Sequence, residues 1–329
     1  MHPRLQRLRT VAVLALVGSL LLPGTAQASR PHTEHPVVLA EIPVGLAPRG
    51  VAFTPDWRFA YVANAGSNTV SVIDVRYRTV TATIPVGQFP YGVAFGGHGA
   101  FVYIANRDSS TVSVIDTGTL TVVKTIPVGL NPRWVAIAPN GRYAYVSSTG
   151  ANAVTVISTA THEVTATIPV GNAPRGIAFT PDGRYAYVAN SDSDTVSVVD
   201  TAAGTAVATI PVGDEPRGVL VTRGGATVYV SNTIGGTVSV IDGRARTVTA
   251  TIPVGASPRG LVLTDTPDTA FVANSGSNTV YTFDTRTNTV TGTVAVGTDP
   301  RWIASGPGHR YAYVTNTGSG TVSVIALDR

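Results

Sequence analysis

Residues 174–213 read PRGIAFTPDGRYAYVANSDSDTVSVVDTAAGTAVATIPVG, and this stretch carries the pattern of nearly the whole chain. Short apolar runs alternate with turn residues. Pro181-Asp182-Gly183 is one such turn, because proline presets φ and glycine accepts a positive φ. Residues 195–200 alternate polar and apolar side chains with the period of two that strands require. The stretch therefore predicts four short β-strands separated by turns.

This unit recurs along the chain without insertion or deletion. Its first proline appears seven times, 42 residues apart, at Pro48, Pro90, Pro132, Pro174, Pro216, Pro258 and Pro300. Four strands in about 42 residues is the size of one propeller blade, whereas helical repeats of that length need a 3.6-residue periodicity. A β-helix is the alternative fold, although its coils are usually shorter. We predict an all-β, seven-bladed β-propeller with four antiparallel strands per blade.

The two ends of the chain predict how the propeller closes. Residues 321–325 match the third strand of the unit, and no fourth strand follows them. Residues 38–45 precede the first copy and match a fourth strand, so we expect the N-terminal strand to complete the last blade. Proline in the fourth strand suits an outer edge, because it removes a hydrogen-bond donor and discourages pairing with another chain. These prolines are Pro43, Pro85, Pro127, Pro169, Pro211 and Pro253.

The first 28 residues have the pattern of an export signal. A segment with three arginines precedes an apolar run over residues 11–22, and Ala26-Gln27-Ala28 is a small-residue cleavage site. A membrane anchor is the alternative, but the run is shorter than the ~20 residues of a spanning helix. We expect a signal peptide (1–28), an N-terminal tail (29–36) and one propeller domain (37–329). The mature protein would be a secreted, periplasmic or extracellular monomer without a membrane span, after cleavage near Ala28.

Charge and cysteine content exclude several classes of function. The chain has 23 basic and 19 acidic residues, and the signal contains three arginines and no acid, which leaves 20 against 19, or +1. This balance argues against strong non-specific binding of nucleic acid. The chain has no cysteine, which excludes disulfides, thiolate metal sites and a lipid-modified N-terminal cysteine.

A recurring four-residue motif resembles that of a known family. Residues 313–316 read Tyr-Val-Thr-Asn, and close variants recur at residues 61–64, 187–190 and 229–232. The chain resembles the YVTN family of seven-bladed propeller repeats over essentially its whole mature length. The resemblance implies a secreted or periplasmic, surface-layer-like protein. Some relatives are reported to bind single-stranded DNA, and more distant seven-bladed relatives include lactonases and an antibiotic-cleaving lyase.

The residue after each repeat proline is the main candidate for a binding site. If the first strand starts at the mouth of the central channel, these side chains surround that mouth, and guanidinium groups there would attract and grip anions. The alternative is structural, with the arginines paired inside the protein, for example Arg217 with Glu215 and Arg301 with Asp299. The seven residues are Arg49, Tyr91, Arg133, Arg175, Arg217, Arg259 and Arg301.

Aromatic residues interrupt the repeat near the same mouth. Blade 2 has Phe89 beside Tyr91, while Trp134 and Trp302 replace the glycine that follows the arginine in blades 3 and 7. Aromatic side chains beside arginines could stack on bases, sugars or planar ligands. Alternatively, the two tryptophans plug the channel axis.

Catalytic and cofactor motifs are missing from the sequence. We find no nucleophile elbow, dinucleotide fingerprint, P-loop or zinc-protease motif. His98, His162 and His309 fall in turns of different blades, on the face opposite the arginines, and we expect no catalytic residue, metal or cofactor. We predict a binding or scaffold protein whose channel mouth contacts an anionic ligand, a cell-envelope component or a protein. The alternatives are a lactonase-like hydrolase or lyase, and an anion or single-stranded nucleic-acid binder.

Overall fold

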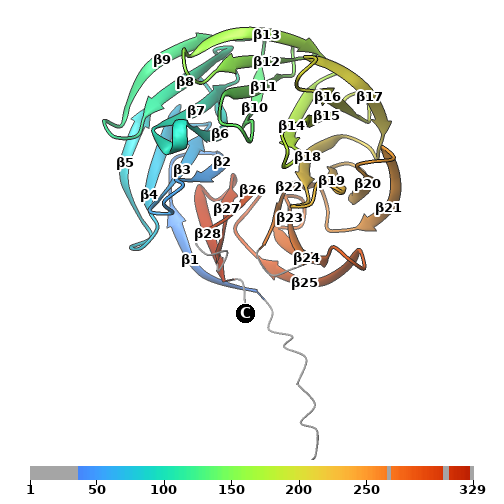
Figure 1. Ribbon diagram of the computed structural model, residues 1–329. Coiled ribbons are helices and arrows are strands. Elements are labelled where there is room, and N and C mark those ends of the chain that lie inside the picture. Colours follow the sequence, from blue (N-terminus) through green and yellow to red (C-terminus); the bar gives the residue numbers. More distant parts are fainter. Residues whose placement is uncertain (1–35, 265–267, 307–310, 327–329) are drawn as a thin grey trace, which may run out of the picture. The chain divides into compact units, whose positions relative to one another are not determined.

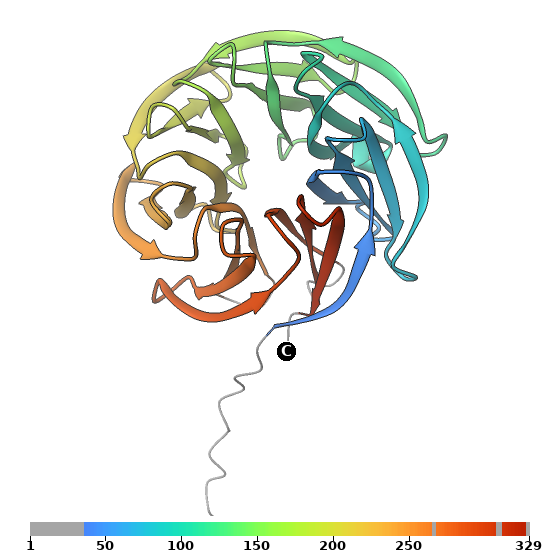
Figure 2. The same cartoon turned by 180° about the vertical axis from the view of Figure 1, so that it is seen from behind.

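The computed structural model describes residues 36–264, 268–306 and 311–326, and these residues form a propeller. The predicted signal peptide, nearly all of the tail and His309 lie outside the described residues. Seven four-stranded antiparallel sheets surround a central axis (Figures 1 and 2), as the repeat predicts. In six sheets the strands follow one another from the axis outward in chain order, and in the seventh the N-terminal strand is outermost. The first strand of every blade therefore lines the channel.

The blade boundaries follow the repeat closely. Blade 1 contains β2 (Pro48–Phe53), β3 (Phe59–Asn64), β4 (Thr69–Asp74) and β5 (Thr79–Pro85). Blade 2 contains β6 (Pro90–Gly96), a 3-10 turn η1 (Gly97–Gly99), β7 (Phe101–Asn106), β8 (Thr111–Asp116) and β9 (Thr121–Pro127). Blade 3 contains β10 (Pro132–Ile137), β11 (Tyr143–Ser148), β12 (Ala153–Ser158) and β13 (Glu163–Pro169). Blade 4 contains β14 (Pro174–Phe179), β15 (Tyr185–Asn190), β16 (Thr195–Asp200) and β17 (Thr205–Pro211).

The remaining three blades repeat this order. Blade 5 contains β18 (Pro216–Val221), β19 (Thr227–Asn232), β20 (Thr237–Asp242) and β21 (Thr247–Pro253). Blade 6 contains β22 (Pro258–Leu263), β23 (Thr269–Asn274), β24 (Thr279–Asp284) and β25 (Thr289–Ala295). Blade 7 contains β26 (Pro300–Ser305), β27 (Tyr311–Asn316) and β28 (Thr321–Ala326), and its outer strand is β1 (Val37–Pro43).

Strand β1 closes the propeller, which confirms the predicted role of the N-terminal strand. It pairs antiparallel with β28, and Ile42 lies opposite Val322. The Ile42 side chain is 2% exposed and belongs to a core cluster that joins blades 7 and 1. The Glu41 carboxylate accepts hydrogen bonds from the Thr321 hydroxyl (2.6 Å) and the Ser323 hydroxyl. Backbone pairing and side-chain hydrogen bonds therefore both attach the N-terminal strand to the C-terminal strand.

The hydrophobic core lies between neighbouring sheets rather than at the axis. Second- and third-strand side chains such as Tyr187 and Val198 pack against Val219 and Val228 of the next blade, and the other clusters repeat this arrangement. First strands also approach closely: a Cβ on Gly50 would lie 2.5 Å from the Tyr91 carbonyl oxygen. The repeat therefore uses glycine after the arginine because the backbones of adjacent blades almost touch there.

The repeated asparagines and aspartates have structural roles. The Asn190 amide donates to the Thr195 and Ser197 hydroxyls (3.1 and 2.9 Å), which ties the second strand to the third. The asparagines of blades 1, 2, 5 and 7 make the same pair of bonds. The Asp200 carboxylate accepts backbone N–H groups of the turn that follows it. The asparagine side chain therefore connects neighbouring strands. Among the described residues, no helix is long and apolar enough to cross a membrane.

Candidate functional site

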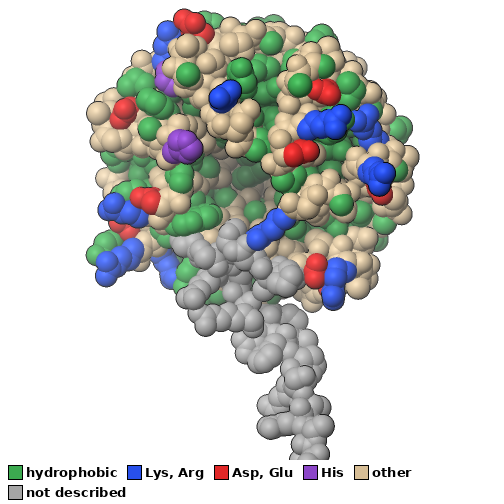
Figure 3. All heavy atoms as spheres, viewed as in Figure 1, with side chains coloured by type: hydrophobic (Ala, Val, Ile, Leu, Met, Phe, Trp, Pro, Cys, Tyr) green, Lys and Arg blue, Asp and Glu red, His purple; other side chains and the backbone are tan. Residues whose placement is uncertain are grey.

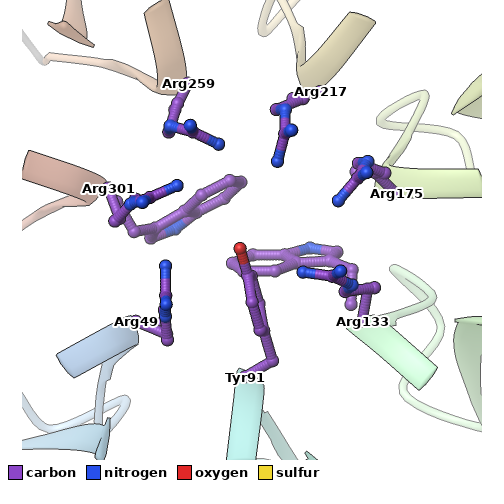
Figure 4. A pocket seen from close by; sticks show the side chains of 11 residues that line it. Arg49, Tyr91, Arg133, Arg175, Arg217, Arg259 and Arg301 are labelled. Carbon is purple, nitrogen blue, oxygen red and sulfur yellow. The ribbon is translucent and has the colours of Figure 1, made fainter. Parts of the chain in front are cut away.

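The mouth of the channel is lined by the residues that follow the repeat prolines. Each first strand begins at this face, so its second residue extends toward the axis, as Figure 4 shows for all seven blades. They line a pocket of about 440 Å³, which includes space open to solvent. The lining residues are Arg49, Gly50, Tyr91, Arg133, Trp134, Arg175, Gly176, Arg217, Arg259, Arg301 and Trp302. We call the six arginines of this set the mouth arginines.

Two tryptophans meet at the axis. The ring centroids of Trp134 and Trp302 are 3.7 Å apart at an interplanar angle of 40°. This contact is possible because blades 3 and 7 are almost opposite in a ring of seven. The backbone N–H of Trp134 donates to the Ser147 hydroxyl (3.1 Å), which donates to the Arg175 carbonyl of the next blade (2.5 Å). The two indoles therefore lie against each other across the axis, as the plugging interpretation predicted, and they also line the pocket.

Two carboxylates partly neutralise the mouth arginines. Asp299 accepts hydrogen bonds from Arg301 Nε (2.9 Å) and Nη2 (2.6 Å). Glu215 is hydrogen-bonded to Arg217 and lies 4.0 Å from Arg175 Nη2. Both pairings were expected from the sequence. Six guanidinium groups and two carboxylates leave an excess of four positive charges (6 − 2 = 4) when Tyr91 is protonated.

Several mouth guanidinium groups keep unused donors. The Nε atoms of Arg175 and Arg259 donate to the hydroxyls of Ser191 and Ser275, each at 2.8 Å, which aligns both side chains without neutralising their charge. Four buried nitrogens of the mouth arginines have no acceptor among the described residues, namely Arg49 Nε, Arg133 Nε, Arg217 Nε and Arg259 Nη1. A buried donor without a partner is costly. An anion in the pocket would offer the missing acceptors.

Tyr91 is the one exception among the seven and lies between two arginines. The Arg49 and Arg133 guanidinium carbons are 5.3 and 4.9 Å from its ring centroid. Phe89 does not line the pocket: its ring lies under Arg49 (5.5 Å) and Arg107 (5.1 Å) at the outer edge of the mouth. Guanidinium groups thus already cover the faces of both rings.

The concentration of positive charge changes the acid–base chemistry of the mouth. Burial, assisted by neighbouring arginines, lowers the pKa of Arg175 to about 10 and that of Arg259 to about 9. Burial alone would raise the pKa of the Tyr91 hydroxyl, but the field of Arg49, Arg133, Arg217 and Arg301 outweighs it and lowers this pKa to about 7. Tyr91 is therefore a group that ionises near neutral pH.

Sequence reasoning missed the serines and the acidity of Tyr91. Ser191 and Ser275 directly follow the asparagine of the four-residue motif, where other blades have alanine, threonine or arginine. This difference between blades was the sequence signal that could have identified the two serines. The acidity of Tyr91 has no local signal, because arginines from other blades cause it.

The histidines do not form a site with the mouth. His162 Nδ1 is 2.8 Å from the Tyr103 hydroxyl, and His98 lies in η1 on the opposite face. Within the described part of the chain, no group of three or more His, Asp or Glu residues could hold a metal ion.

The fold and the repeat define the chain as a seven-bladed β-propeller with its polar site at the channel mouth. Two family models match parts of it, the YNCE-like β-propeller over residues 40–183 and the seven-bladed β-propeller lactonases over residues 158–294. The YVTN-family resemblance fits this class of propeller. None of the curated proteins matches the chain.

Solved structures share the fold. A chain of Kuenenia stuttgartiensis hydrazine synthase superposes with a TM-score of 0.80 at 23% identity, covering 92% of this chain and 99% of that one. At this identity the similarity establishes the fold alone.

Proposed function

We propose that this propeller is an extracytoplasmic binding protein whose channel mouth holds a compact, multiply charged anion. One observation carries the proposal: six arginines from six blades converge on one pocket, and among the described residues only two carboxylates, Glu215 and Asp299, pair with them. Guanidinium groups bind carboxylate, sulfate and phosphate oxygens in bidentate geometry. The four buried arginine nitrogens without an acceptor also support anion binding in this pocket. The export-signal pattern of residues 1–28 supports a location outside the cytoplasm.

The shape of the mouth favours a small ligand over a nucleic-acid chain. Trp134 and Trp302 contact each other, and the faces of Tyr91 and Phe89 are covered by guanidinium groups. Bases stacking on these rings would have to displace those contacts. A compact anion needs no such change, because it sits among the mouth arginines above the indoles.

Sulfate is a suitable probe, because it stays a dianion across the useful pH range. We expect calorimetric titration at pH 6 and low salt to show saturable binding. Replacing Arg133 or Arg259 by glutamine should weaken it about 10- to 100-fold, since a charge-assisted hydrogen bond contributes about 1.5–3 kcal/mol. Arg184→Gln is the matched control, because Arg184 is exposed in the turn between β14 and β15 on the opposite face. Equal affinities in all three variants would refute the proposal.

Hydrolysis of a lactone is the second candidate, which the lactonase family match favours. A tyrosine with a pKa of about 7 is suited to activate water as a general base, and the adjacent arginines would stabilise an oxyanion. Glucono-1,5-lactone hydrolysis, followed with the wild type and with Tyr91→Phe, tests this candidate. Activity that depends on Tyr91 would support an enzyme, whereas rates equal to buffer for both proteins would exclude this substrate.

A further inference from the structure

A second pocket lies on the face opposite the mouth, between blades 7 and 1. It encloses about 1200 Å³, including space open to solvent. Figure 3 shows this face, where Lys and Arg side chains gather at the lower left over blade 1. We call this pocket the blade 1 groove and define it by the side chains of Trp57, Arg58, Arg76, Tyr77, Arg78 and Tyr311.

Trp57 is out of place in its own repeat. It occupies the turn position between β2 and β3 with φ of 60°, where blades 3, 4 and 5 have glycine with φ of 70–72°. This left-handed region disfavours large side chains. The indole nevertheless packs beside Phe53, with ring centroids 5.7 Å apart, at the edge of the groove. Trp57 therefore places a large aromatic ring where the corresponding turns of blades 3, 4 and 5 have no side chain.

A buried hydroxyl in the groove has no partner. The tyrosines at the same repeat position in blades 4 and 5, Tyr187 and Tyr229, donate to the carbonyls of Gly243 and Thr285 in the next blade (3.1 and 3.0 Å). Tyr313 is 1% exposed and lines the groove, but its hydroxyl makes no hydrogen bond within the described part of the chain. Burial raises its pKa to about 12, so it remains a donor at neutral pH.

The groove carries a local excess of positive charge above flat aromatic surfaces. Arg76 lies over the ring of Tyr77 (5.4 Å) and Arg78 over that of Tyr311 (5.6 Å). Asp74 is the only carboxylate among the described lining residues, which gives three arginines against one acid. No ion pair within 4.0 Å joins these three arginines to a carboxylate in the described part of the chain.

The corresponding pocket between blades 4 and 5 shares two of these arginines. Arg244 and Arg246 are the counterparts of Arg76 and Arg78, and Arg246 lies over the ring of Tyr185 (4.9 Å) as Arg78 lies over that of Tyr311. The described lining of that pocket includes Arg244 and one acid, Asp182, with glycine at positions 224 and 225 and no tryptophan. The repeat therefore produces a depression between blades that contains arginines in both places. Blade 1 adds Trp57, Arg58 and Tyr77 to it, where blade 5 has Gly225, Ala226 and Ala245.

We propose that the blade 1 groove is a second binding site, specific for a small anion that carries an aromatic ring, such as an aromatic carboxylate. The ring would stack on Trp57, because Arg76 already covers the ring of Tyr77, and the carboxylate would pair with Arg76 and Arg78. Guanidinium groups that already lie over aromatic rings are aligned for this arrangement. The site is separate from the channel mouth and does not depend on its proposed function.

The three tryptophans of the chain allow the two sites to be observed separately. Trp57 reports on the groove, and Trp134 and Trp302 report on the mouth. The full mature chain, labelled with 5-fluorotryptophan, is titrated with 1-naphthoate and with its neutral analogue 1-naphthamide, and fluorine NMR follows each signal. A Trp57→Phe variant assigns the groove resonance.

We expect 1-naphthoate to shift the Trp57 resonance saturably and 1-naphthamide to bind at least tenfold more weakly. Arg76→Gln and Arg78→Gln should each weaken the Trp57 response to naphthoate at least fivefold. Arg244→Gln, at the corresponding turn of blade 5, is the matched control and should leave it unchanged. A Trp57 resonance that does not move, that responds equally to the neutral analogue, or that is insensitive to both arginine variants would overturn the proposal.

Discussion

Replacing Tyr91 by phenylalanine should remove the pH dependence of anion binding at the mouth. The hydroxyl of Tyr91 points into the pocket between Arg49 and Arg133 (Figure 4), and its pKa is lowered to about 7. Below pH 7 the phenol is neutral and leaves the mouth arginines free to bind an anion. Above pH 7 the phenolate neutralises part of this charge and repels the ligand. Binding should therefore weaken as the pH rises through 7.

The magnitude follows from the pKa. At pH 8 the phenolate outnumbers the phenol by about ten to one, so a ligand that requires the phenol loses about tenfold in affinity, or about 1.4 kcal/mol, relative to pH 6. Sulfate titrations at pH 6, 7 and 8 measure this loss in the wild type. In Tyr91→Phe the affinity should change less than twofold. The reasoning would be refuted if sulfate affinity changed equally with pH in the two proteins, or if it did not change with pH in the wild type.

The same group makes a prediction for the ligand-free protein. An acid whose pKa is lowered on folding contributes stability that is fully present above its unfolded pKa of about 10 and is lost as the pH falls through its folded value of about 7. Between pH 7 and 9 the free energy of unfolding of the wild type should rise by up to about 3 kcal/mol. Urea titrations should show a smaller rise for Tyr91→Phe.

Three further outcomes test the closure, the mouth and the groove. Ile42→Ala should lower the free energy of unfolding by about 2–5 kcal/mol in urea titrations, because it leaves a cavity where β1 closes the ring. Glu215→Gln should raise sulfate affinity about tenfold in calorimetry, because it removes the carboxylate that neutralises Arg217. Trp57→Gly should change the stability by less than about 1 kcal/mol, measured by thermal unfolding, because relief of the φ of 60° is offset by the lost contact with Phe53 and by the greater freedom of glycine in the unfolded chain.

The two proposed sites use different features of one repeat. At the mouth, six blades have an arginine at the same repeat position. The fold brings these six arginines to one axis, where they form a ring. In the groove, blade 1 departs from the repeat at Trp57 and Tyr77, which add aromatic rings beside arginines that blade 5 also has. Loss of either site by mutation should therefore leave the other intact.

The architecture was predictable from the sequence, because its determinants are local. The 42-residue spacing of the prolines, turn residues such as Pro181-Asp182-Gly183, and the unpaired fourth strand at residues 38–45 each act on neighbouring chain and together specify seven blades and their closure. The ring of arginines was also predictable, since every first strand begins at the same end of the channel and places its second residue at the mouth.

What only the tertiary structure decided depends on contacts between blades. The Trp134–Trp302 contact joins residues that are 168 positions apart (302 − 134), and it exists because seven blades bring blades 3 and 7 to opposite sides of a narrow axis. The acidity of Tyr91 arises from arginines of four other blades, and the unpartnered hydroxyl of Tyr313 arises from how blade 7 meets blade 1. Distances across the axis and the loss of solvent set these properties, and neither is encoded in a local sequence pattern.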